Sequence, residues 1–155
     1  MKTLVLGLGN DLLADDAVGL LAADELKNRL AGRADVVGTS WHGLALLEFF
    51  IGYQRAIVMD SVRTFRHAPG TIIEMDGGAL RPARIPSPHF AGWPEMLHLA
   101  HELGIIFPPR VRIFAVEVAD ASTIGGSMTP AVRRAVPELC ARVCQAVSAY
   151  TCNRK

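Results

Sequence analysis

Short apolar runs alternate along this chain with longer segments whose apolar residues recur at helical spacing. Short, continuous apolar runs are typical of buried parallel strands. The alternation predicts a three-layer α/β/α fold built on a mostly parallel, twisted sheet of about five strands. The expected strands are residues 3–7, 34–38, 55–60, 70–75 and 110–117, and the expected helices are residues 16–31, 43–51, 93–103 and 130–149.

The run at residues 70–75 interrupts this alternation, because the turn before it is too short to hold a helical crossover. We therefore expect an antiparallel strand at an edge of the sheet. The 155 residues contain no internal repeat, low-complexity tract or linker. A chain of this length can bury a proper core, so we expect a single domain over residues 1–155.

Charge and composition argue against several functional classes. The net charge of +1 gives no electrostatic basis for binding nucleic acid or an anionic membrane. No apolar run approaches the roughly 18–20 residues that a membrane span needs. The N-terminal segment lacks a small-residue cleavage site, and we interpret it as a first strand rather than a signal peptide.

The cysteines also bear on the class of protein. All three, Cys140, Cys144 and Cys152, lie near the end of the sequence, and an odd, local group does not make a disulfide framework. Cys140 and Cys144 are four residues apart on an expected helix, where we expect them to pack as core residues. A reducing cytoplasm is the expected location.

Three residues with ligand side chains follow expected strands or lie in a constrained loop. Asp16 follows the first strand, Asp60 closes the strand at residues 55–60, and His89 lies in a loop whose prolines restrict the backbone. Ligands of open α/β sheets bind outside the carboxyl ends of the strands. Two carboxylates and an imidazole there are a mixed oxygen and nitrogen set for a borderline divalent metal, with positions left open for substrate or water.

Each of the three residues also has a structural interpretation. Asp16 can cap a helix, Asp60 can hold a turn, and His89 can be an ordinary loop histidine. The residues alone leave the two interpretations open. Asp15, next to Asp16, is interpreted as a capping or solvated partner. If Asp16 and Asp60 lie close together without a metal, we expect their repulsion to raise the pKa of one of them.

A second polar cluster lies in the segment EMLHLAHE. It lacks the spacing of a His-Glu-x-x-His zinc motif, and we interpret it as a solvated helix face. Its members are Glu95, His98, His101 and Glu102.

A nucleotide site is also disfavoured. Gly7 and Gly9 match the first two glycines of the dinucleotide fingerprint, but Leu12 stands at the third position and no acid ends the second strand. Carboxylates after the first strand would also repel a phosphate.

Four motifs taken in order resemble one protein family. The segment from Gly7 to Gly19 matches G-x-G-N-x-[LI]-x-x-D-[DE]-x-x-G, and Asp60 lies in IVMDSV. A Ser-Pro-His loop occupies residues 87–89, and GGSMTPAV opens the last expected helix. Together they resemble the maturation proteases of [NiFe]-hydrogenases, over essentially the whole chain.

This resemblance implies a cytoplasmic endopeptidase of an aspartic or metal-dependent type. Such an enzyme removes the C-terminal extension of the nickel-loaded hydrogenase large-subunit precursor, which is its expected partner. The resemblance assigns the catalytic and metal-contacting positions to Asp16, Asp60 and His89. The nickel is supplied by the substrate, and no organic cofactor is implied. A non-cleaving recognition module or chaperone for the large subunit, or a small-ligand or nucleotide-binding α/β domain, are the alternatives.

The chain departs from the family pattern at two acidic positions. Gly38 stands where many members have an acid after the second strand, and Asp16 stands where Glu is frequent. Trp41 and His42 follow where small residues are more common, and His42 is interpreted as a surface histidine.

Overall fold

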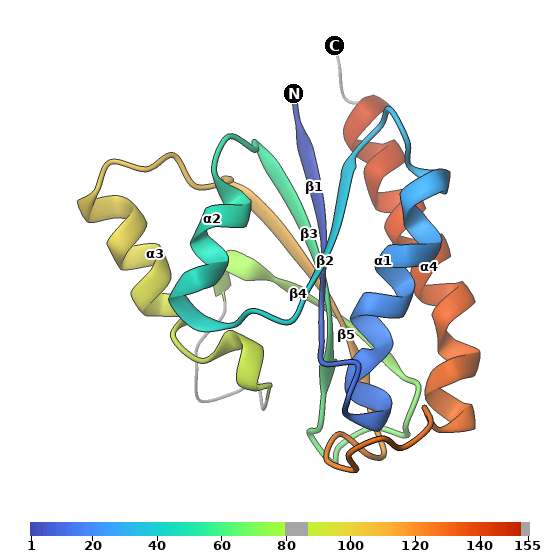
Figure 1. The fold of residues 1–155 in the computed structure, drawn as a ribbon. Coiled ribbons are helices and arrows are strands. Elements are labelled where there is room, and N and C mark those ends of the chain that lie inside the picture. The colour runs from blue at the N-terminus through green and yellow to red at the C-terminus, as the bar shows by residue number, and fades with distance from the viewer. Residues whose placement is uncertain (80–86, 153–155) are drawn as a thin grey trace.

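The computed structural model describes residues 1–79 and 87–152 of the chain. Strands and helices alternate through most of it, as the sequence predicts (Figure 1). The strands are β1 (Thr3–Leu8), β2 (Asp35–Thr39), β3 (Arg55–Val62), β4 (Ile72–Asp76) and β5 (Arg110–Glu117). The helices are α1 (Val18–Arg29), α2 (Leu47–Phe50), α3 (Trp93–Glu102) and α4 (Pro130–Cys152), with short 3₁₀ turns η1 (Ala14–Ala17), η2 (Gly43–Leu46), η3 (Gly77–Ala79) and η5 (Pro88–Phe90).

The five strands form one sheet in the order β2-β1-β3-β5-β4. β1 pairs in parallel with β2 and β3, β3 pairs in parallel with β5, and β4 pairs antiparallel to β5 at the edge. The predicted fold class is therefore confirmed, including the antiparallel edge strand. The parallel register brings the carboxyl ends of β1, β2, β3 and β5 to one edge of the sheet.

Helices cover both faces of the sheet and make a three-layer fold (Figure 1). One core lies against α1 and α4 and includes Val5 and Ile57, while the other lies against α2 and α3 and includes Leu6 and Val58. Neighbouring residues of one strand thus enter opposite cores, as the two-residue period of a strand requires. The central strands are buried on both faces, which explains their continuous apolar runs.

Several boundaries differ from the sequence prediction by a few residues, and the helix expected at residues 43–51 is the 3₁₀ turn η2 followed by the short α2. Two differences bear on the site. β3 does not close at Asp60 but continues to Val62, because Ser61 and Val62 still pair with β5. Asp60 and Ser61 are adjacent polar residues, and a polar pair after an apolar run is typical of the end of a strand. The predicted helix at residues 16–31 begins as the 3₁₀ turn η1 and becomes α-helical only at Val18.

The glycines of the first motif allow α1 to pack directly against the sheet. A Cβ atom on Gly7 would lie 2.1 Å from the carbonyl oxygen of Gly19, and one on Gly19 would lie 2.1 Å from the carbonyl oxygen of Leu8. Neither distance is possible for a real side chain. These glycines therefore serve a close backbone contact, which holds η1 above the ends of the central strands.

The burial of Cys140 and Cys144 and the character of the helices agree with the sequence predictions. Cys140 is fully buried in the core beside α1, and Cys144 packs against that core, as predicted. Among the described residues, no helix combines the length and the apolar character required to span a bilayer.

Candidate metal centre

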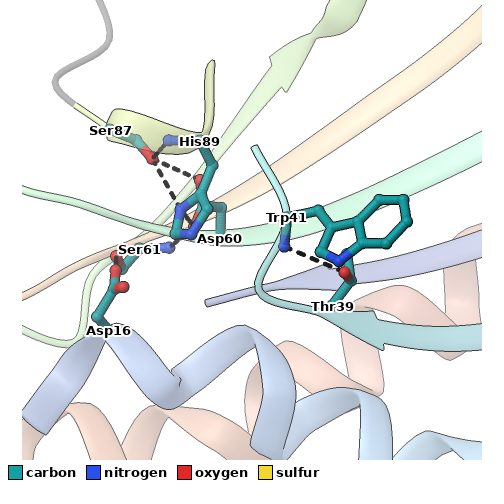
Figure 2. A network of polar contacts seen from close by, with 7 residues as sticks. All are labelled: Asp16, Thr39, Trp41, Asp60, Ser61, Ser87 and His89. Carbon is teal, nitrogen blue, oxygen red and sulfur yellow. Dashed lines mark hydrogen bonds and ion pairs between the residues drawn. The ribbon is translucent and has the colours of Figure 1, made fainter. Parts of the chain in front are cut away.

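Asp16, Asp60 and His89 meet at the carboxyl edge of the sheet, although they come from η1, β3 and η5 (Figure 2). One ligand atom from each lies within 4.8 Å of the other two. Their exposed fractions are 4%, 0% and 5%. Within residues 1–79 and 87–152, no other group of three or more such side chains converges in this way. The structure therefore brings all three sequence candidates to one place.

Asp16 is held by one side-chain contact. The hydroxyl of Ser61 donates a hydrogen bond to Asp16 Oδ1 at 2.5 Å, and both residues are buried. The backbone of Asp16 is fixed within the turn by hydrogen bonds to Asn10 and Leu13. No described residue donates a hydrogen bond to Asp16 Oδ2, so one carboxylate oxygen is available to a ligand.

Asp60 has partners at both oxygens. Its Oδ1 accepts a hydrogen bond from the Ser61 backbone N–H at 2.8 Å and lies 3.1 Å from His89 Nδ1. Its Oδ2 accepts the hydroxyl hydrogen of Ser87 at 2.6 Å. Asp60 and His89 thus form a buried pair that the two serines hold in place.

The Ser-Pro-His motif has a local structural reason. Ser87 precedes η5, and its hydroxyl oxygen accepts a hydrogen bond from the His89 backbone N–H at 3.3 Å. Pro88 stands at the first position of the turn, where its fixed φ suits a helical start. The same serine therefore caps the turn, orients Asp60 and fixes the backbone of His89.

The pKa values of both members of this pair are raised, but for different reasons. Burial lowers the pKa of His89, but the hydrogen bond and charge of Asp60, with the charge of Asp16, outweigh burial and raise it. Burial raises the pKa of Asp60, against the opposing effects of His89, Ser87 and the Ser61 N–H. The raised carboxyl pKa therefore comes from burial, and not from the expected repulsion by Asp16.

Asp15 has a different role from its neighbour. It is fully buried, and its carboxylate accepts four hydrogen bonds. The donors are the backbone N–H groups of Ala119 and Asp120 at 3.1 and 3.0 Å, and the N–H and hydroxyl of Thr129 at 2.6 and 2.9 Å. Thr129 directly precedes α4, so Asp15 fastens the start of the last helix. Asp15 therefore binds the segment before the last helix rather than its own turn, and the interpretation as a solvated residue is wrong.

Ser61 and Glu117 are buried polar residues that the sequence pattern did not single out. Glu117 is buried and accepts hydrogen bonds from the N–H and hydroxyl of Thr64 and from the Phe65 N–H, each at 2.8 Å. It fixes the turn after β3, where Phe65 has a φ of +59°. A polar residue inside an apolar strand was the available signal for Ser61.

The other sequence candidates lie away from the centre. Glu95, His98, His101 and Glu102 are all exposed, which confirms the solvated helix face. His42 is exposed as well.

The position of Gly38 faces α1. A Cβ atom there would lie 3.3 Å from Leu20 Cδ2 and 3.6 Å from the Ala23 Cβ. The hydroxyl of the next residue, Thr39, accepts a hydrogen bond from the Trp41 N–H at 3.1 Å at the end of β2 (Figure 2). The Cβ atom of an acid at position 38 would therefore lie on the face of the sheet that α1 covers.

The fold and this cluster define an α/β protein with a buried carboxylate and imidazole centre at the ligand-binding edge of its sheet. A model of the hydrogenase maturation protease family (HycI) matches residues 21–146. The chain is 32% identical over 136 residues to the hydrogenase expression/formation protein HupD of Rhodobacter capsulatus, covering 84% of this chain and 64% of that protein. It is 29% identical over 125 residues to the hydrogenase 2 maturation protease of Escherichia coli, covering 75% and 73%. The chain belongs to the hydrogenase maturation protease family.

Solved structures share the fold of this chain. The hydrogenase maturating endopeptidase HybD from E. coli superposes with a TM-score of 0.79 at 24% identity, covering 97% of this chain and 94% of that one. The [NiFe] hydrogenase maturation protease HybD from Thermococcus kodakarensis gives 0.75 at 23% identity, covering 95% and 99%. The chain thus spans nearly the whole of these structures, but only 64% of the Rhodobacter relative.

Proposed function

We propose that this chain is an endopeptidase that removes the C-terminal extension of a nickel-loaded [NiFe]-hydrogenase large-subunit precursor. The observation that carries the proposal is the convergence of Asp16, Asp60 and His89 at one buried point. The name of the E. coli relative, a hydrogenase 2 maturation protease, supports the substrate class. Nickel enters this account as part of the substrate.

The three side chains recognise nickel through two oxygen ligands and one nitrogen ligand, a set that suits a borderline divalent ion. Before substrate binds, His89 and Asp60 pair with each other. Nickel binding would displace any proton from the ligating nitrogen, because a ligating imidazole must be neutral. Only a precursor that already contains nickel completes the centre, so the pair acts as a checkpoint for assembly.

Peptide hydrolysis then requires a polarised carbonyl and an activated water. The substrate's nickel can polarise the carbonyl and lower the pKa of a water toward about 7, as zinc does in hydrolases. A carboxylate of the cluster accepts the proton of that water and delivers it to the leaving amine as the C–N bond breaks, and general acid–base help of this kind contributes roughly 10²–10⁴ in rate.

Incubation of the purified protein with its large-subunit precursor, with and without inserted nickel, tests this function. We expect intact mass spectrometry to show loss of a C-terminal peptide only from the nickel-loaded precursor. A stable complex without loss of mass would contradict cleavage and favour a recognition module. Equal cleavage of both precursors would contradict the checkpoint.

A further inference from the structure

Among the residues that the structure describes, Ser61 is the only one that donates hydrogen bonds to both carboxylates of the cluster. Its hydroxyl donates to Asp16 Oδ1 at 2.5 Å, and its backbone N–H donates to Asp60 Oδ1 at 2.8 Å. Figure 2 shows Ser61 between the two acids. It is buried, with an exposed fraction of 3%, so water does not readily replace these bonds.

The bond to Asp16 is the only side-chain or backbone hydrogen bond that the described residues donate to that carboxylate. A buried carboxylate without a donor is costly, and a hydroxyl donor to a charged acceptor makes a strong bond. The bond occupies Oδ1 and leaves Oδ2 open. It therefore decides which Asp16 oxygen is presented to a ligand and in which direction.

The backbone position of Ser61 adds a second constraint. Residues 60 and 61 are consecutive in β3 and both pair with β5, so the sheet fixes the Ser61 Cα relative to Asp60. Asp16, in contrast, lies in the short turn η1, 45 residues away in sequence. The Ser61 hydroxyl is thus the contact that ties a carboxylate on a turn to a carboxylate on a rigid strand.

We propose that Ser61 is a positioning residue that holds Asp16 at the correct distance from Asp60 and His89 for nickel recognition. This inference rests on the proposed function and deepens it. Partners that orient metal ligands in this way typically alter metal affinity or activity by about 10–100-fold when they are removed. Ser61 acts through Asp16 and does not itself contact the metal.

The chain offers a matched control in Thr64. Its hydroxyl donates to the buried carboxylate of Glu117 at 2.8 Å, which is the same kind of bond outside the cluster. Thr64→Val removes that hydroxyl with little change of shape. Ser61→Ala removes the corresponding group inside the cluster, and Ser61→Thr retains it.

The test titrates NiCl₂ into the free wild-type protein and these variants by calorimetry, and measures kcat and KM on the nickel-loaded precursor. We expect Ser61→Ala to weaken nickel binding by about 10-fold or more and to raise KM for the precursor. Ser61→Thr should restore most of the affinity, and Thr64→Val should bind nickel as the wild type does. Equal affinities for Ser61→Ala and the wild type would overturn the inference.

A double-mutant cycle separates this inference from the proposed function and removes dependence on one variant. The neutral amide of Asp16→Asn is less costly to bury than the carboxylate. In this background, Ser61→Ala should change nickel affinity by less than about twofold. A full effect in that background would overturn action through Asp16. If Asp16→Asn leaves nickel binding unchanged, or if the wild type binds no nickel, the proposed site itself is wrong and the inference falls with it.

Discussion

Two pairs of buried carboxylates in this protein differ in what surrounds them. Asp15 and Glu117 accept hydrogen bonds from several backbone N–H groups and a threonine hydroxyl each. The partners of Asp16 and Asp60 are mainly side chains. These two carboxylates accept hydrogen bonds from two serine hydroxyls and one backbone N–H, and Asp60 also pairs with an imidazole. Asp15 and Asp16 are neighbours in sequence, so the difference arises within a single turn.

The comparison shows that burial alone does not mark a functional acid. Backbone donors are fixed by the fold, and a carboxylate that they saturate is committed to holding loops together. Side-chain donors leave a carboxylate with an open oxygen or with a partner that a metal can replace. The surroundings of Asp15 and Glu117 therefore predict losses of stability on substitution, whereas those of Asp16 and Asp60 predict losses of activity.

Among the substitutions that test this contrast, we expect Asp16→Asn to have the largest effect, a loss of cleavage activity. We expect Asp16→Asn to lower kcat/KM on nickel-loaded precursor by at least about 100-fold, because the amide is a poor nickel ligand and no base. The free energy of unfolding should change by less than about 1 kcal/mol, since the amide oxygen still accepts the Ser61 hydroxyl. Cleavage kinetics and urea denaturation measure the two quantities. Near-normal cleavage would contradict the contrast and indicate that Asp16, like Asp15 and Glu117, has a structural role.

The neighbouring acid should give the opposite pattern. Asp15→Ala leaves three backbone N–H groups without their acceptor, and we expect it to lower the free energy of unfolding by about 3 kcal/mol. Urea denaturation measures this loss. A loss below about 1 kcal/mol would break the comparison, because a saturated, buried carboxylate would then contribute no more than an exposed one.

The His89–Asp60 pair predicts a pH dependence of the metal-free protein. The raised pKa of His89 means that its contribution to stability is fully present below about pH 6.5, the unfolded value. That contribution is lost as the pH rises through the higher folded value. We expect the difference in unfolding free energy between wild type and His89→Asn to shrink over this rise. A difference that grows with pH would contradict the pairing.

Thr64→Val is expected to have the smallest effect. It removes one of three hydrogen bonds to Glu117, and we expect a loss of about 1 kcal/mol in unfolding free energy with unchanged cleavage of the precursor. Thermal or urea denaturation and the cleavage assay measure both. A marked loss of cleavage would show that the Glu117 turn also serves the reaction.

The residue pattern was sufficient to predict much of this fold, and together with the family resemblance it pointed to the three residues of the cluster. Parallel strands end at one edge, so residues near the ends of β1 and β3 had to approach each other, and the Ser-Pro-His loop supplied the third side chain. The strand predicted at residues 110–117 has the observed bounds of β5, Arg110–Glu117.

The details of the centre depend on tertiary packing that a linear pattern does not contain. The role of Ser61 follows from η1 resting above β3, which requires the close contact of Gly7 with Gly19. The different roles of Asp15 and Asp16 depend on the segment before α4, which is more than 100 residues away in sequence. Thr129 in that segment donates a hydrogen bond to Asp15. The extension of β3 past Asp60 likewise depends on its pairing with β5.

A crystal structure of the protein soaked in NiCl₂, with data collected at the nickel absorption edge, tests the central claim most directly. We expect one strong anomalous peak at the carboxyl edge of the sheet, within bonding distance of Asp16, Asp60 and His89, with the Ser61 hydroxyl still bound to Asp16. A peak at another position, or no peak between these three side chains, would contradict the account.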